Sequence, residues 1–359
     1  MQDIIHHLSH IDLDGYSCQF VMQHTPYKLK NYNANYGAEV KSKLEIILEN
    51  IKSDKKSALI LITDLNLTMD ESRWIHGEVS KLNSDKLDVK ITLLDHHGSG
   101  EDSAKKYDWY FLDTQRSATK ITYDYAKENF ELDEPEWLQK YVNVVNAVDL
   151  WKLDEVENFE YGKVCMRLVN ETRELNRVMF ANEDNHYKLS LIKRAVEFMH
   201  LDNAPVVLDE KIHLLKKEFF RQDLNDTLDN LSTKYIVSLL GTKRDTNTIY
   251  YKGYKGYLSY GVGNTSIVGN GFLVTYPEYD FIVDVSYRGA MSLRANFNVS
   301  VAQIAKEWAN GGGHPNAAGG RIQGFKEQFR YDKVKQQIEE IIYDKESRAS
   351  VLEHKKESE

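Results

Sequence analysis

Residues 90–100 read KITLLDHHGSG, an apolar segment that ends in one aspartate, two histidines and a glycine-containing turn. On its own, such an Asp-His-His triplet is usually a polar loop that follows a strand. Other apolar segments in the first 150 residues also end in aspartates or histidines. The residues that accompany the triplet therefore decide between a loop and a functional site.

The first half of the chain alternates between short apolar runs and amphipathic stretches. The expected strands are 4–10, 57–64, 90–97 and 109–112. The expected helices are 16–24, 38–51, 71–82 and 117–130. Alternation of helices with almost wholly apolar strands predicts an α/β fold, with a mostly parallel sheet covered by helices on both faces. In such a sheet, functional side chains gather at the carboxyl ends of the strands.

The length of 359 residues suits two domains better than one hydrophobic core. We expect a catalytic domain at 1–195, a helical connector at 196–232, a smaller α+β domain at 233–345 and a charged tail at 346–359. In the connector, the spacing of four apolar side chains predicts one buried helix face; these are Leu208, Ile212, Leu215 and Phe219.

The composition predicts a globular cytoplasmic protein. Hydrophobic residues make up 42% of the chain and charged residues 28%, and the mean hydropathy is −0.54. We see no signal peptide, no apolar run of the roughly 20 residues that span a bilayer, and too few cysteines for a disulfide framework. A net charge of −9 argues against a protein that grips long duplex nucleic acid. The sequence does not indicate an oligomeric state.

The segment SHIDLDGYS (9–17) brings three candidate ligands into one short stretch. In an extended chain alternate side chains share a face, so His10, Asp12 and Asp14 are expected to converge. Gly15 then permits a sharp turn into the following helix. The alternative is an aspartate-rich turn that caps this helix, but three ligand-type residues on one face favour a metal site.

Two more aspartates end apolar runs: Asp64 closes SALILITD and Asp149 follows VVNAV. Either would be an ordinary cap or turn residue by itself. In the Asp-His-His triplet, neighbouring side chains face opposite ways, so one imidazole can bind a metal while the other points to a phosphate. Asp95 can lie behind them and fix a histidine tautomer.

The candidate ligands are two imidazoles and four carboxylates, namely those of His10, His96, Asp12, Asp14, Asp64 and Asp149. Structural zinc prefers thiolates and calcium avoids imidazole, so this mixture favours two divalent cations of the Mn²⁺ type. Mg²⁺ and Co²⁺ remain alternatives. Two such cations together can activate a water for attack on phosphorus.

HIDLDG, the TD that ends a strand, LLDHHG and NAVDLW occur in the order of the four motifs of the DHH phosphoesterases, and residues 1–155 resemble that superfamily. The resemblance implies that His10, Asp12 and Asp64 hold one cation. It implies that Asp14, Asp64, His96 and Asp149 hold the other, with Asp64 bridging. His97, supported by Asp95, would meet the substrate phosphate.

The segment GGGHPNAAGG (311–320), with SLR at 292–294, resembles the DHHA1 domain, and this resemblance covers about 235–325. In the superfamily that domain binds the nucleotide portion of the substrate. The substrate contacts that the resemblance implies are Arg294 and His314, and the backbone amides of Gly312 and Gly313 could closely approach an anion of the substrate. The alternative is a glycine cap followed by a turn. We also expect a capping box at Ser300 and Gln303 on the preceding helix.

QRSATK (115–120) places Arg116 and Ser117 at an expected helix start, which can bind phosphate oxygens. Ser117 is equally well explained as the N-cap of that helix. Both residues are therefore candidates for substrate binding, and a purely structural role stays open.

The chain most resembles the nanoRNase B type of bacterial oligoribonuclease. We expect a two-metal phosphodiesterase that hydrolyses short single-stranded RNA from an end to 5′-mononucleotides. Alternatives are a phosphatase for 3′-phosphoadenosine 5′-phosphate and a phosphodiesterase for linear or cyclic dinucleotides. Acidic charge disfavours a RecJ-type exonuclease on long DNA, and the glycine motif disfavours a pyrophosphatase. A nucleotide-sensing regulator with a relic metal site is the alternative of another class, against which the complete ligand set argues.

Overall fold

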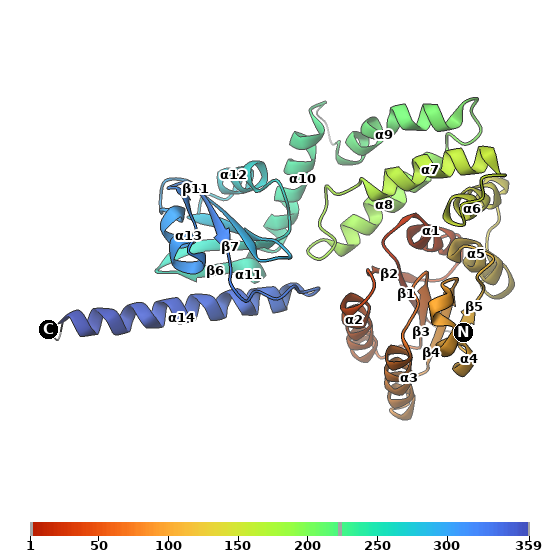
Figure 1. Ribbon diagram of the computed structural model, residues 1–359, viewed down its shortest axis with the longest axis horizontal. Coiled ribbons are helices and arrows are strands. Elements are labelled where there is room, and N and C mark those ends of the chain that lie inside the picture. The colour runs from red at the N-terminus through yellow and green to blue at the C-terminus, as the bar shows by residue number, and fades with distance from the viewer. Residues whose placement is uncertain (1–2, 222–224, 358–359) are drawn as a thin grey trace. The chain divides into compact units, whose positions relative to one another are not determined.

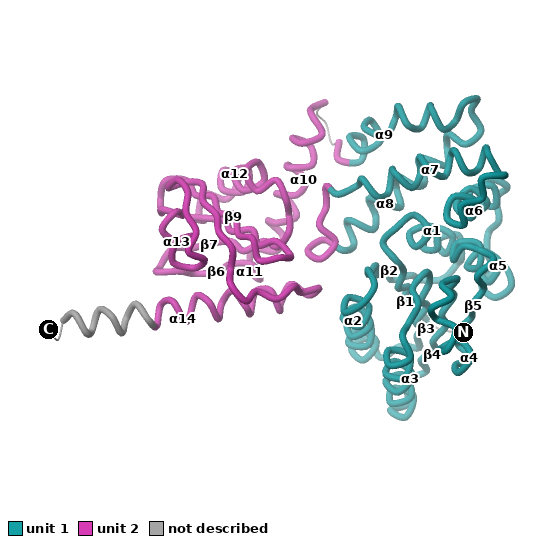
Figure 2. Tube along the Cα trace, viewed as in Figure 1, with its two compact units in different colours: residues 1–173, 181–219 teal, residues 174–180, 220–359 magenta. Residues whose placement is uncertain are grey.

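A computed structural model describes residues 3–221 and 225–357. The chain forms two compact units, which Figure 2 distinguishes by colour. Unit 1 contains residues 1–173 and 181–219, and unit 2 contains residues 174–180 and 220–359. The boundary near 219 falls inside the expected connector, of which 222–224 lie outside the described residues.

Unit 1 is built on a parallel sheet of five strands in the order β2-β1-β3-β4-β5 (Figure 1). The strands are β1 (Ile4–Ser9), β2 (Leu29–Asn33), β3 (Ala58–Thr63), β4 (Val89–Asp95) and β5 (Tyr110–Leu112). The sequence therefore predicted four of them and the fold class correctly. It missed β2, an edge strand whose residues LKNYN are largely polar.

Nine α-helices and one 3₁₀ turn of the described residues accompany this sheet. They are α1 (Leu13–Met22), α2 (Ala38–Asp54), α3 (Met69–Ser84), η1 (Gly98–Gly100), α4 (Glu101–Lys106), α5 (Ala118–Asn129), α6 (Glu136–Asp149), α7 (Val156–Asn170), α8 (Ala181–Val196) and α9 (Ala204–Phe220). Three of the apolar positions expected in the connector, Leu208, Ile212 and Leu215, are buried in α9.

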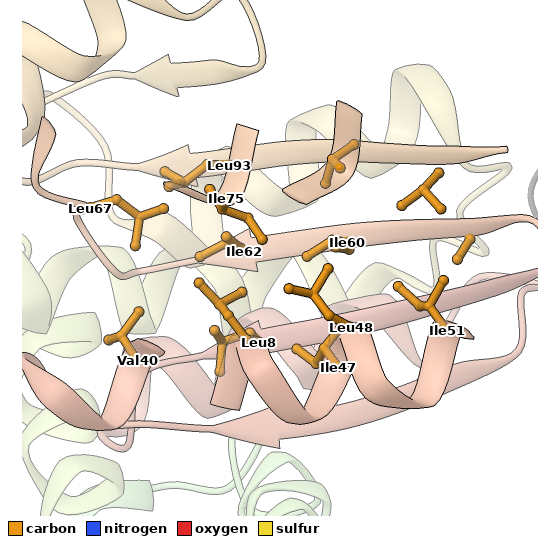
Figure 3. Close-up of a cluster of buried hydrophobic side chains, with 14 of the residues drawn as sticks. Leu8, Val40, Ile47, Leu48, Ile51, Ile60, Ile62, Leu67, Ile75 and Leu93 are labelled. Atoms are coloured by element: carbon orange, nitrogen blue, oxygen red, sulfur yellow. The ribbon is translucent and has the colours of Figure 1, made fainter. Parts of the chain in front are cut away.

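One hydrophobic core of unit 1 lies between the sheet and helices α2 and α3. Leu8, Ile60 and Ile62 point from the strands toward Ile47 and Leu48 of α2 (Figure 3). Each such side chain contributes about 1.5–3 kcal/mol through burial. Helices α1 and α5 contact the strands as well, and they carry residues of the site described below. This core holds the three central strands in register up to their carboxyl ends.

Unit 2 contains a mixed sheet of six strands in the order β10-β11-β9-β8-β7-β6, in which the β7–β8 pair alone is parallel. The strands are β6 (Thr248–Tyr251), β7 (Tyr254–Tyr260), β8 (Phe281–Val285), β9 (Ala290–Ala295), β10 (Gly312–His314) and β11 (Ala317–Arg321). The helices are α10 (Leu228–Thr242), α11 (Arg244–Asn247), α12 (Thr265–Thr275), α13 (Val301–Ala309) and α14 (Tyr331–Glu357). The expected α+β architecture is confirmed.

One local expectation differs from the structure. Ser300 is the N-cap of α13, but its side chain makes no capping hydrogen bond, and Gln303 bonds Glu307 one turn further on. The expected tail continues α14 as far as Glu357, and residues 358 and 359 lie outside the described part. Across the described ranges, no helix has both the length and the apolar character needed to cross a membrane.

Candidate metal centre

The carboxyl ends of three neighbouring strands bring the candidate ligands together. Ser9 of β1 is in register with Thr63 of β3, which is in register with Leu94 of β4. The next residues along these strands therefore lie at one edge of the sheet. His10 follows β1, Asp64 follows β3, and Asp95, His96 and His97 end or follow β4. Asp149 joins them as the last residue of α6.

The aspartates after His10 converge through a helix start, so the predicted extended conformation is wrong. Helix α1 begins at Leu13, and Asp12 caps it by accepting a hydrogen bond from the Gly15 amide at 3.0 Å. Asp14 lies buried in the first turn. A Cβ on Gly15 would lie 2.5 Å from the carbonyl oxygen of His10, so this close turn requires glycine.

Asp64 occupies an unusual backbone conformation at the centre of the site. Its φ is +56°, in the left-handed region that non-glycine residues seldom adopt, and its amide donates to the Leu94 carbonyl at 3.1 Å. Such conformations cost about 1–3 kcal/mol and occur mostly where function requires them. The conformation turns a fully buried carboxylate toward two imidazoles, those of His10 and His96.

Two groups of ligand atoms meet around this carboxylate. In the first, Nδ1 of His10 lies 2.9 Å from Oδ2 of Asp12 and 3.6 Å from Oδ2 of Asp64. In the second, Nε2 of His96 lies 3.3 Å from Oδ1 of Asp64 and 3.8 Å from Asp14.

Asp149 completes the second group, 3.6 Å from Nδ1 of His96. Within each of the sets His10–Asp12–Asp64 and Asp14–His96–Asp149, one ligand atom per residue lies within 4.8 Å of the others. All six candidate ligands are therefore gathered at one point, with Asp64 between the two groups.

Several of these atoms lack the partners that buried polar atoms normally have. Nδ1 of His10, Oδ2 of Asp64 and Oδ2 of Asp149 are buried without a hydrogen bond. The His10–Asp12 approach of 2.9 Å does not have hydrogen-bond geometry. Unpartnered buried nitrogen and oxygen atoms that face one another are the arrangement a cation satisfies. The donor set therefore fits divalent cations.

The electrostatics of the cluster lead to the same conclusion. Burial, together with the charge of Asp14, raises the pKa of Asp149 to about 9, and burial with Asp12 and Asp14 raises the pKa of Asp64 well above its usual value. Burial disfavours a charged His10, but the neighbouring Asp12 and Asp64 carboxylates raise its pKa to about 10. The raised pKa values reflect the repulsion that these groups would suffer if all were ionised, and bound divalent cations would remove that repulsion.

Helix α5 fixes Asp14 from behind. The amides of Ala118 and Thr119 donate to its two carboxylate oxygens at 2.7 and 2.8 Å, and the Thr119 hydroxyl donates to the Asp14 carbonyl at 2.8 Å. The start of α5 therefore binds an aspartate of the protein, where the sequence predicted a substrate phosphate. Asp14 thus keeps one orientation toward His96.

The structure gives Arg116 and Ser117 roles within the protein. Ser117 is fully buried and caps α5 by accepting from the Lys120 amide, the alternative that the sequence had left open. Arg116 forms ion pairs with Asp113 at 2.7 Å and Asp124 at 2.6 Å. Binding of substrate by these two residues stays a prediction.

His97 lies beside the second ligand group, with a ligand atom within 4.8 Å of those of Asp64 and His96, and it belongs to a chain of hydrogen bonds. Its Nδ1 donates to Oδ1 of Asp95 at 2.7 Å, and Tyr110 donates to the other Asp95 oxygen at 2.9 Å. On the outer side, Nε2 of His97 is hydrogen-bonded to the Tyr36 hydroxyl at 3.0 Å. Asp95 therefore orients the ring of His97, and its part in the reaction stays a prediction. The sequence did not single out Tyr36, because it follows the unpredicted strand β2.

The predicted substrate contacts of unit 2 lie on adjacent strands. Ala317 of β11 pairs with Arg294 on one side and with His314 on the other, so the three residues are level across the sheet. The guanidinium of Arg294 donates to the Ser266 hydroxyl at 2.5 Å and to the Leu293 carbonyl at 2.7 Å. Gly312, Gly313 and His314 are exposed. A Cβ on Gly313 would meet the Ala317 carbonyl oxygen at 2.6 Å, which explains this glycine.

No protein-family model matches the sequence. A 3′,5′-cyclic-nucleotide phosphodiesterase of Helicobacter pylori is 43% identical to this chain, over 94% of this chain and 98% of the relative. The oligoribonuclease NrnB of Bacillus subtilis is 23% identical, over 94% of this chain and 79% of NrnB. A crystal structure of an uncharacterized protein from Helicobacter pylori G27 superposes with a TM-score of 0.87 and 42% identity, and covers 95% of this chain and 99% of that one.

Proposed function

The chain belongs to the DHH/DHHA1 phosphoesterase superfamily and is a metal-dependent phosphodiesterase, and from this premise we propose that it hydrolyses the phosphodiester bond of 3′,5′-cyclic nucleotides. The observation that carries the proposal is the buried Asp64 carboxylate between two groups of ligand atoms. The choice of substrate follows the Helicobacter pylori relative, which matches almost along its whole length.

The roles of the ligands follow from their grouping. His10, Asp12 and Asp64 would hold one cation, and Asp14, Asp64, His96 and Asp149 the other. Imidazole and carboxylate ligands together suit Mn²⁺, with Mg²⁺ and Co²⁺ as alternatives. When bound, such cations act as Lewis acids toward a phosphoryl group and lower the pKa of water.

The protein side chains supply orientation and charge for the reaction. The amides at the start of α5 hold Asp14 in one orientation, so its carboxylate is ready for a cation without rearrangement. Asp95 fixes the ring of His97, so that Nε2 faces away from the sheet. We propose that this nitrogen contacts a phosphoryl oxygen of the substrate. A hydrogen bond or a positive charge at that oxygen stabilises the transition state.

Short oligoribonucleotides are the second candidate substrate, supported by the likeness to NrnB. The exposed glycines beside His314 and Arg294 would contact the nucleotide portion of such a substrate. Hydrolysis from one end would then release 5′-mononucleotides. Linear or cyclic dinucleotides and 3′-phosphoadenosine 5′-phosphate are further members of the same class of small phosphate esters.

A digestion panel tests the proposal. Purified protein is incubated with Mn²⁺, Mg²⁺ or Co²⁺ and with cyclic AMP, cyclic GMP, cyclic dinucleotides, 3′-phosphoadenosine 5′-phosphate, and end-labelled RNA and DNA from dimers to 24-mers. We expect Mn²⁺-dependent turnover of the cyclic mononucleotides, abolished in His96→Ala. Preference for RNA dimers to pentamers would replace the first candidate with the second. An active His96→Ala variant would overturn the ligand assignment.

A further inference from the structure

Tyr36 lies over the candidate metal centre although no motif of the sequence pointed to it. Its hydroxyl is 3.0 Å from Nε2 of His97, and its ring centroid is 4.7 Å from that of His10. The ring also meets the His97 ring edge to face, at 5.7 Å. With 41% of its surface exposed, Tyr36 stands between the buried ligands and the solvent.

The loop that carries Tyr36 is fixed by the surrounding structure. The Ala34 amide donates to the Ser9 carbonyl at 3.0 Å, which ties the loop to the end of β1. The Asn35 amide donates to the fully buried carboxylate of Glu39 at 2.9 Å, and the Tyr36 amide donates to the Asn35 side chain at 2.9 Å. Gly37 follows with a φ of +82°, which turns the chain into α2. Tyr36 is thus held in place by its own backbone.

We propose that Tyr36 is a catalytic residue whose hydroxyl donates a hydrogen bond to the same phosphoryl oxygen as His97. The inference rests on the proposed function, which turns Nε2 of His97 toward that oxygen. The two side-chain atoms are 3.0 Å apart, so a single oxygen can lie at hydrogen-bond distance from both of them. Without substrate, the Tyr36 hydroxyl and the His97 imidazole are hydrogen-bonded to each other.

The hydroxyl is suited to remain a donor at the centre. A tyrosine phenol has an ordinary pKa of about 10, so it carries its proton at neutral pH and can donate it to a hydrogen bond. A neutral donor adds no positive charge that would compete with the cations. Donors aimed at a developing oxyanion are typically worth about 100- to 1000-fold in turnover.

Tyr36→Phe tests the proposal because it removes the hydroxyl and keeps the ring. Tyr32→Phe is the matched control, since the Tyr32 hydroxyl is likewise hydrogen-bonded to a histidine, His6, at 3.1 Å, but away from the ligand groups. On the best substrate of the panel, we expect Tyr36→Phe to lower kcat by about 100-fold and to change KM by less than about threefold. Tyr32→Phe should keep both constants within about twofold.

Two further measurements separate the possible outcomes. Mn²⁺ binding of Tyr36→Phe should match that of the wild type, and its thermal unfolding should change by no more than the loss of the single hydrogen bond to His97 explains. A kcat of Tyr36→Phe within about threefold of the wild-type value, with the fold intact, would overturn the role of Tyr36 while leaving the proposed function standing. If the wild-type protein turns over no substrate of the panel, the proposed function itself fails.

Discussion

Replacing Gly15 by alanine should displace the backbone of His10, one of the candidate metal ligands. The new Cβ would lie 2.5 Å from the carbonyl oxygen of His10, 2.7 Å from its carbonyl carbon and 2.8 Å from its nitrogen. Ordinary contacts begin at 3.4 Å, so the two backbone segments must separate by about 0.9 Å. The atoms in conflict belong to the backbone of a candidate ligand, and no side-chain rotation can relieve them.

The consequences of Gly15→Ala can be measured separately on activity and on stability. A misplacement of about 1 Å at a reacting centre costs roughly 100-fold in rate, which we expect in kcat/KM with Mn²⁺. The strain should lower the free energy of unfolding by about 1–3 kcal/mol, measured by urea titration.

Two glycine variants are controls for Gly15→Ala. Gly77→Ala in the middle of α3 meets open space and should stabilise the protein by about 0.5–1 kcal/mol. Gly98→Ala, directly after His97, also meets open space and should keep the rate within about threefold. A Gly15→Ala variant as active and as stable as the wild type would refute the close turn at His10.

Other predictions concern the cations, a buried histidine and a buried aspartate. Removal of divalent ions with a chelator should lower the unfolding temperature, and Mn²⁺ at about 100 times its dissociation constant should restore about 2.7 kcal/mol, seen by calorimetry. Burial lowers the pKa of His7 from about 6.5 in the unfolded chain to about 3 in the folded protein. Between these two pH values the unfolded chain binds a proton at His7 and the folded protein does not. As the pH drops from about 6.5 to about 3, His7 should therefore lower the free energy of unfolding by about 1.4 kcal/mol per pH unit. Urea titrations of His7→Gln over the same pH range should show a shallower fall. Asp95→Asn should lower kcat by about 10- to 100-fold, because the ring of His97 loses its charged partner, while Mn²⁺ binding by calorimetry stays unchanged.

The sequence predicted the framework of unit 1 where burial dominates. Strand β3 (ALILIT) is a nearly continuous apolar run because helices cover both faces of the sheet, and β1 and β4 carry shorter apolar stretches that are also visible in the sequence. Strand β2 lies at the edge and carries polar residues, so its pattern does not differ from that of a loop. The Tyr36 loop follows β2 and remained undetected for the same reason.

The structure brings the six candidate ligands together, and cation binding by them stays a prediction, but their local geometry differs from the predicted one. Alternation in an extended chain and the start of a helix can both place His10, Asp12 and Asp14 close together, and spacing alone does not separate them. The helix start at Ser117 shows a second reason why the sequence was insufficient. Its pattern predicts an anion, but the anion is Asp14, which lies more than 100 positions earlier in the chain. Contacts over such distances depend on tertiary packing.

Anomalous diffraction at the manganese edge, from crystals of the protein grown with Mn²⁺, tests the central claim most directly. We predict two peaks on opposite sides of the Asp64 carboxylate, at ligand distances of about 2.0–2.3 Å. One peak should be bound by His10 and Asp12, and the other by Asp14, His96 and Asp149. No peak, or ions bound elsewhere while these six side chains keep the contacts seen here, would contradict the account.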